Sequence, residues 1–80
     1  MIVDITRNAM QVETGGKVAT LPGELLFPPG VTMGFVIYRG AIKNWDAPYQ
    51  DQAISPAEVD AILAEVKQEF DRLGNLLEIE

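Results

Sequence analysis

The sequence predicts an α+β fold, in which one amphipathic helix packs on one face of a small, mostly antiparallel β-sheet. Three observations predict it. Short alternating segments fill the first half of the chain, a Gly-Gly turn joins two of them, and a later segment carries apolar residues at helical spacing. We expect two hairpins plus a C-terminal strand in the sheet. With 80 residues, the chain is predicted to form a single domain, 1–80, with a thin core.

The first hairpin is predicted near the N-terminus. Residues 2–6 and 8–13 alternate apolar and polar side chains, as half-buried strands do. A Thr-Gly-Gly sequence at 14–16 supplies the positive φ angles of a tight turn. Residues 17–21 are therefore expected to return beside 8–13.

The second hairpin is predicted in the middle of the chain. Proline and glycine at 22–24 and 27–30 indicate loops before it. Residues 34–38 carry no charge, which is typical of a strand buried on both faces. An Arg-Gly turn then leads into a returning strand predicted at 41–45.

The helix is predicted to run from Pro56 to Leu73. Ser55 is the expected N-cap, Pro56 takes the first helical position, and Glu58 completes a capping box. Gly74 is placed to end the helix in the left-handed conformation. The apolar stripe of the helix consists of Val59, Ile62, Leu63, Val66, Phe70 and Leu73.

One helix covers only one face of a sheet, to which residues 76–80 are predicted to add a last strand. The strand at 34–38 nevertheless carries apolar side chains on both sides. Either Val36 and Tyr38 or the side chains that alternate with them must therefore face away from the helix. Two arrangements would bury them: the segment 22–33 folds back over this face, or the face is an interface with a second copy or a partner.

The residue inventory excludes most catalytic chemistry. The chain has no cysteine and no histidine, which rules out disulfides, thiolate nucleophiles, Cys-type zinc sites and the usual general base. Asp46 and Asp51 beside Trp45 and Tyr49 suggest a glycosidase-like carboxylate pair. A thin core, however, rarely provides the apolar cleft that raises the pKa of an acid catalyst. We expect no enzymatic activity, no cofactor and no metal site.

The net charge of −6 comes entirely from the last part of the chain, since residues 51–80 carry two basic and eight acidic side chains. A negative surface repels phosphate backbones and anionic lipids, so we expect no nucleic-acid and no membrane partner. It would attract a basic protein, and the alternative is an ordinary solvated helix face. The sequence lacks a membrane-span-length apolar segment and the regions of a signal peptide, which predicts a cytoplasmic location.

Two groups of residues are candidates for partner binding. Trp45, Asp46, Tyr49 and Asp51 form a loop in which two aromatic side chains could anchor an interface. The alternative places Trp45 in the core at the end of a strand, with Tyr49 packed on the core's edge. The second group lies along one flank of the helix, called here the helix flank: Glu58, Glu65 and Glu69.

Short motifs run through nearly the whole chain: Ile5-Thr6-Arg7, Leu21-Pro22-Gly23-Glu24-Leu25-Leu26, Phe35-Val36-Ile37-Tyr38, and Ile42-Lys43-Asn44-Trp45 with Pro48-Tyr49. With these motifs and its acidic helix, the chain resembles a small family of bacterial immunity proteins of polymorphic toxin systems, the one numbered seventy-four. The resemblance implies a cytoplasmic protein that binds and neutralises one cognate secreted toxin. Many such toxins are nucleases, whose clefts are basic. Composition leaves an alternative open, which is a small acidic adaptor or phage-encoded interaction module, with a homodimer as one form.

Overall fold

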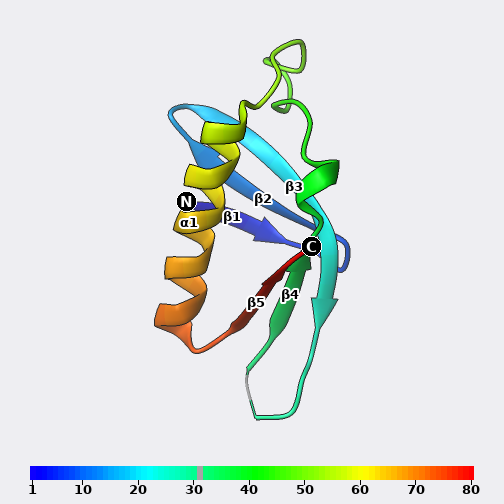
Figure 1. Cartoon of the computed structure of the whole chain (residues 1–80), viewed down its shortest axis with the longest axis vertical. Coiled ribbons are helices and arrows are strands. Elements are labelled where there is room, and N and C mark those ends of the chain that lie inside the picture. The colour runs from blue at the N-terminus through cyan, green and yellow to red at the C-terminus, as the bar shows by residue number, and fades with distance from the viewer. Residues whose placement is uncertain (31) are drawn as a thin grey trace.

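The computed structural model describes residues 1–30 and 32–80, and these form a five-stranded sheet with a helix on one face (Figure 1). The strand order is β1-β2-β3-β4-β5. All neighbouring strands are antiparallel except β4 and β5, which are parallel. The predicted α+β class is confirmed. The elements are β1 (Ile2–Ile5), β2 (Ala9–Thr14), β3 (Lys17–Leu26), β4 (Gly34–Ile37), the 3₁₀ helix η1 (Arg39–Ala41), α1 (Pro56–Leu73) and β5 (Leu76–Ile79).

The first predicted hairpin is confirmed, and its returning strand is longer than expected. β2 and β3 meet at Gly15 and Gly16, whose φ angles are +58° and +82°. β3 then continues through residues 22–24, where a loop was predicted, and pairs with β4 in its second half. β3 is therefore shared by both halves of the sheet.

Pro22 and Gly23 lie inside β3 for reasons that only the folded sheet supplies. The backbone N–H of Gly23 points toward β2. Because backbone N–H groups alternate in direction along a strand, an N–H at position 22 would point to the opposite side of β3. The N–H that Pro22 lacks is therefore not needed for the pairing of β3 with β2. On that other side, the Pro22 carbonyl accepts a hydrogen bond from the Tyr38 N–H (2.9 Å). A Cβ on Gly23 would lie 1.9 Å from the carbonyl oxygen of Val36, so only glycine fits this contact.

The hairpin predicted between residues 34–38 and 41–45 does not form. β3 and β5 occupy both edges of β4, so no edge is left for a returning strand. Residues 39–41 form η1 instead. Beyond it, the pairing within 42–54 is an isolated bridge between Asn44 and Ala53. The second hairpin of the sheet is the one between β3 and β4.

α1 begins and ends where the sequence predicts. The Ser55 hydroxyl accepts a hydrogen bond from the Glu58 N–H (3.1 Å), and the Glu58 carboxylate accepts one from the Ser55 N–H (2.9 Å). Gly74 closes the helix with a φ of +74°. The strand predicted at 76–80 is β5, and α1 provides the long crossover that parallel pairing with β4 requires. No helix in the described residues is long and apolar enough to span a membrane.

The core lies between α1 and the inner face of the sheet. Leu73, assigned to the apolar stripe, is half exposed at the end of the helix. The loop after η1 adds apolar side chains to the core. The buried cluster contains Met10, Val12, Ala19, Leu21, Phe35, Ile37, Ile42, Trp45, Ile54, Val59, Ile62, Leu63, Val66 and Phe70.

The outer face of the sheet, turned away from α1, carries Val36 and Tyr38. Val36 is only 5% exposed, whereas Tyr38 is 38% exposed. In the strand register Val36 stands between Glu24 on β3 and Glu78 on β5, and the aliphatic stems of such neighbours flank a side chain on the same face. On the outer face, Val36 is therefore flanked by glutamate side chains and not by a second apolar layer.

Within the described residues, the segment predicted to fold back, 22–33, does not lie over this face. Its first five residues lie in the plane of the sheet as part of β3. Val31 lies outside the described residues. The exposed Phe27 leaves the sheet at the end of β3, with 77% of its surface accessible.

Candidate partner-binding surface

The loop that contains four of the predicted binding residues packs along the free side of β3. Trp45 is 4% exposed and belongs to the core, so the core alternative for Trp45 is correct and its side chain is not presented as an interface anchor. The backbone N–H of Trp45 donates to the Gln52 carbonyl (3.1 Å), and the backbone N–H of Ile54 donates to the Lys43 carbonyl (2.8 Å). These bonds close the loop on itself.

Lys17 holds this loop against the start of β3. Its ammonium nitrogen lies 5.4 Å from the Trp45 ring centroid and 5.3 Å from that of Tyr49. It also donates a hydrogen bond to the Gln52 side chain (2.7 Å). One cation therefore contacts two aromatic rings and an amide, and Tyr49 packs against the edge of the core.

Asp46 is bound to the sheet, whereas Asp51 is exposed. The Asp46 N–H donates to the Val18 carbonyl (2.8 Å), and its carboxylate accepts a hydrogen bond from the Thr20 hydroxyl (2.6 Å). Asp51 lies at the exposed tip of the loop. Asp46 therefore has a structural partner within the chain, and Asp51 is the carboxylate that the loop displays to solvent.

The helix flank is charged, and each of its carboxylates has a partner within the chain. Hydrogen bonds from the Ser55 backbone and hydroxyl lower the pKa of Glu58. Glu65 accepts a hydrogen bond from the Met1 amine (2.6 Å). The Arg72 guanidinium binds Glu69 through two nitrogens and lowers the pKa of that carboxyl.

The predicted binding residues are divided between different parts of the surface. Trp45 and Glu58 line the same small cleft, of about 210 Å³, together with Lys17. Glu65 and Glu69 line another, of about 560 Å³, on the β1 side of α1. The structure thus brings Glu58 toward the loop and leaves the other two glutamates elsewhere.

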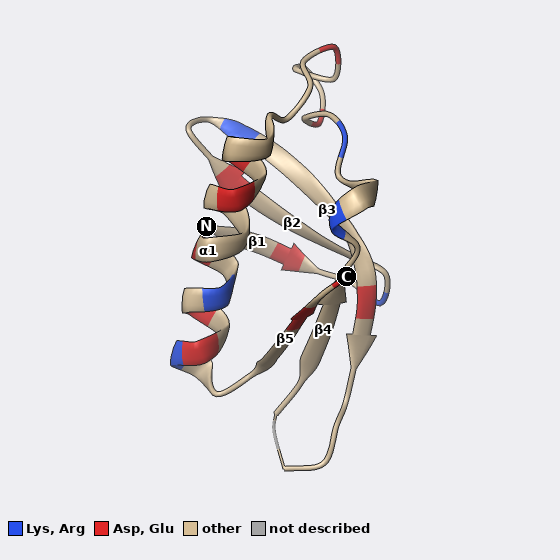
Figure 2. Cartoon of the chain, in the orientation of Figure 1, with Lys and Arg blue, Asp and Glu red and all other residues tan. Residues whose placement is uncertain are grey.

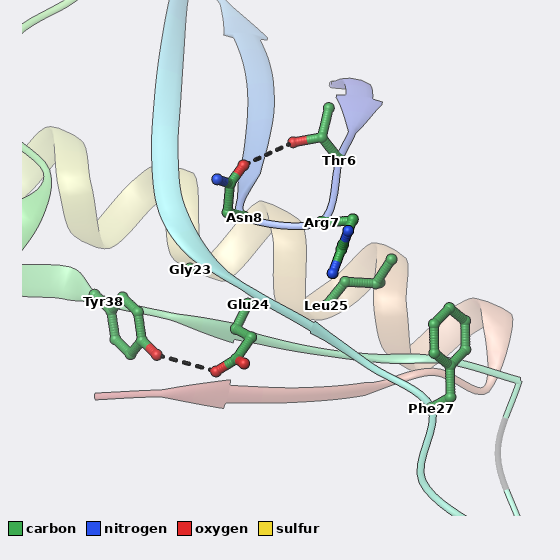
Figure 3. A pocket seen from close by; sticks show the side chains of 8 residues that line it. All are labelled: Thr6, Arg7, Asn8, Gly23, Glu24, Leu25, Phe27 and Tyr38. Carbon is green, nitrogen blue, oxygen red and sulfur yellow. Dashed lines mark hydrogen bonds between the residues drawn. The ribbon is translucent and has the colours of Figure 1, made fainter.

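A groove of about 720 Å³ on the outer face of the sheet was not predicted from the sequence (Figure 3). It lies where the turn between β1 and β2 meets β3 and the end of β4. The exposed aromatic rings of Phe27 and Tyr38 stand at its two ends, and Arg7 lies between them. Aromatic and arginine side chains of this kind are enriched where proteins bind one another. The sequence clue was Phe27 beside two prolines, a large apolar side chain in a loop.

Three carboxylates beside this groove form what we call the outer acidic patch: Glu24, Glu78 and Glu80. Figure 2 shows acidic segments on β3 and β5. The Tyr38 hydroxyl donates to Glu24 (3.4 Å). The charge of Glu24, followed by burial and the charge of Glu80, raises the pKa of Tyr38. Within residues 1–30 and 32–80, none of the three carboxylates forms an ion pair. Their charge is therefore less compensated than that of the helix flank.

The described residues bring no three histidine, cysteine, aspartate or glutamate side chains together as a group that could hold a metal ion. The candidate site is thus a protein surface with exposed aromatic rings and carboxylates.

Comparison with known proteins assigns the chain to a family. The family model described as immunity protein 74 matches residues 2–80. No curated protein and no solved structure gives a significant match.

Proposed function

Since the chain belongs to the immunity protein 74 family, we propose that it binds one cognate bacterial toxin directly and neutralises it in the cytoplasm. The family match over residues 2–80 is the observation that carries this proposal. An inhibitor of this kind acts by occupying a surface of the toxin, so it needs complementary shape and charge rather than catalytic side chains.

The charge of the chain favours a toxin with a basic substrate cleft, and a nuclease is the toxin class we propose. Nucleases bind phosphate backbones, which requires lysine and arginine in the cleft. The chain carries a net charge of −6. An acidic protein approaches such a cleft faster than a neutral one, because long-range attraction raises the rate of encounter.

Two acidic surfaces compete for this role. The helix flank is the one that the sequence suggests, and we retain it as a source of long-range attraction. The outer acidic patch lies beside exposed aromatic rings and an open groove, so we propose that it belongs to the contact itself. Asp51 at the exposed loop tip forms no ion pair among the described residues and adds to this charge.

Co-expression with the product of the gene adjacent to this chain's gene, tested as the candidate toxin, tests the proposal. Cells that produce the toxin should grow only when the chain is present, and the two proteins should purify as one complex. Failure of both growth rescue and complex formation would favour the adaptor alternative. A chain that forms a dimer and does not bind the toxin would favour the homodimeric form of that alternative.

Matched variants then separate the two surfaces. Replacing Glu24, Glu78 and Glu80 with glutamine should weaken toxin binding by roughly tenfold at low salt. The same exchange at Glu58, Glu65 and Glu69 removes an equal number of charges and serves as the matched set. We expect a smaller effect there, since those carboxylates already have partners within the chain.

A further inference from the structure

β5 is an edge strand, and within residues 1–30 and 32–80 no strand pairs with its outward backbone groups. The Leu76 and Glu80 N–H groups donate to the carbonyls of Met33 (3.0 Å) and Ile37 (2.8 Å), on the β4 side. Backbone groups alternate in direction along a strand, so those of Leu77 and Ile79 point away from β4. In the described part of the chain, no other strand pairs with that edge. Two N–H and two carbonyl groups are thus available to another strand.

Exposed apolar side chains accompany this edge. Leu76 and Ile79 on β5 are 40% and 43% exposed, and Leu73 at the end of α1 is 50% exposed. Figure 1 shows β5 rising from the end of α1 along the border of the sheet. Edge strands with apolar side chains are templates for pairing with another chain.

Charge argues against a second copy of this chain as the occupant. An antiparallel copy that used the outward groups of both Leu77 and Ile79 would have its two-fold axis at Glu78. Glu78 would then face the partner's Glu78 directly across the two strands. Like charges in that position destabilise a strand pair, so the acidic side chains of β5 protect the edge from self-association.

The same charges favour a basic strand. Glu78 is not part of any ion pair within residues 1–30 and 32–80, and neither is Glu80. A strand with lysine or arginine opposite Glu78 would gain cross-strand attraction in place of repulsion. It would also satisfy the backbone groups that β5 leaves open.

We infer that the edge of β5 is the site at which the toxin adds an extended, basic strand to the sheet as its sixth strand. This inference rests on the proposed function and specifies how the partner is held. Main-chain hydrogen bonds from Leu77 and Ile79 provide the pairing, and Glu78 and Glu80 select for basic side chains.

Residue-resolved amide exchange of the chain, free and in complex with the toxin identified by the co-expression test, tests this inference. Binding should slow exchange at the Leu77 and Ile79 amides by roughly tenfold or more, since each gains a hydrogen bond. The Leu76 and Glu80 amides are internal controls, because they are already bonded to β4 carbonyls in the free protein.

Two substitutions at one position separate the backbone from the side chain. Ile79→Pro removes the outward N–H and should weaken toxin binding by roughly tenfold or more. Ile79→Ala retains the N–H and should weaken it much less. Thermal melting and circular dichroism check that both variants are folded. If Ile79→Pro does not fold, the amide-exchange measurement on the native chain still tests whether β5 gains a strand.

The outcomes are distinguishable. A complex that forms with unchanged Leu77 and Ile79 exchange would overturn the strand-addition inference and leave the proposed function intact. Absence of any complex would overturn both. Slowed exchange that appears without toxin as the protein is concentrated would assign the edge to a second copy and would overturn the basic-strand inference.

Discussion

Gly23 and the Val36 carbonyl approach each other so closely that a Cβ on Gly23 would lie 1.9 Å from the Val36 oxygen. Gly23→Ala should therefore destabilise the protein by about 1–3 kcal/mol or more, because one of two paired strands must move. Urea denaturation followed by circular dichroism measures this loss.

Gly40 provides the matched control. A Cβ at Gly40 would meet no atom within 4 Å, so Gly40→Ala should change stability by less than about 0.5 kcal/mol. Equal losses in the two variants would contradict the assignment of a steric role to Gly23.

Lys17 is predicted to stabilise the loop through its two aromatic rings. Lys17→Met keeps the aliphatic stem and removes the charge, so it should cost about 0.5–2 kcal/mol. Lys43 is exposed on the same loop and forms no ion pair in residues 1–30 and 32–80, which makes Lys43→Met the charge-matched control. Denaturation midpoints of the two variants should differ, and identical midpoints would show that the ring contacts contribute nothing.

Trp45 is predicted to act through the core and not through the partner. Trp45→Ala should cost about 3–5 kcal/mol, since a large buried ring is removed, and this is a large part of a small domain's stability. Trp45→Phe should stay folded and bind the toxin with unchanged affinity. A folded Trp45→Phe variant with strongly weakened binding would contradict this prediction and show that Trp45 contributes to the interface.

Glu58 should make stability depend on pH. Its folded-state pKa is lowered by the hydrogen bonds from Ser55, so its ionised form stabilises the fold above the unfolded-state pKa, about 4.3. That contribution is lost as the pH falls through the lowered folded-state value. The melting temperature of the wild type should therefore exceed that of Glu58→Gln at about pH 7, and the difference should shrink below about pH 4. A difference that stays constant over this range would refute the linkage.

The helix was predictable because its signals are local. Ser55, Pro56 and Glu58 act within one turn, and Gly74 acts within the turn that follows. Each of these residues contacts its own chain neighbours, so no knowledge of the sheet was needed.

The middle of the sheet was not predictable in the same way. Pro22 and Gly23 indicate a loop on local grounds, and the contacts that keep them in β3 come from Tyr38 and Val36, which lie in another part of the sequence. The prediction of a strand at 41–45 was wrong for a related reason, because β5 occupies the edge of β4 with which residues 41–45 would have paired.

The candidate site shows the same division between local and distant information. The local sequence Trp45-Asp46 does not determine whether the tryptophan ring points into the core or toward solvent. Here the Lys17 ammonium on β3 covers the rings of Trp45 and Tyr49. The residues that display charge could be identified from composition. The pairing of Glu69 with Arg72 is local to α1, whereas the contact of Glu65 with the Met1 amine depends on how the distant N-terminus is placed beside the helix.

The parallel pairing of β4 with β5 has a consequence for the order in which the protein folds. Thr14 pairs with Lys17 across a two-residue turn, whereas Gly34 pairs with Leu76 only after the intervening chain has been looped back. Loop closure over a longer stretch has a larger entropic cost and must precede the contacts that reward it. The β2–β3 hairpin is therefore expected to form early, and β5 to join last, once α1 has docked. Substitutions in β5 should accordingly accelerate unfolding while leaving the folding rate nearly unchanged.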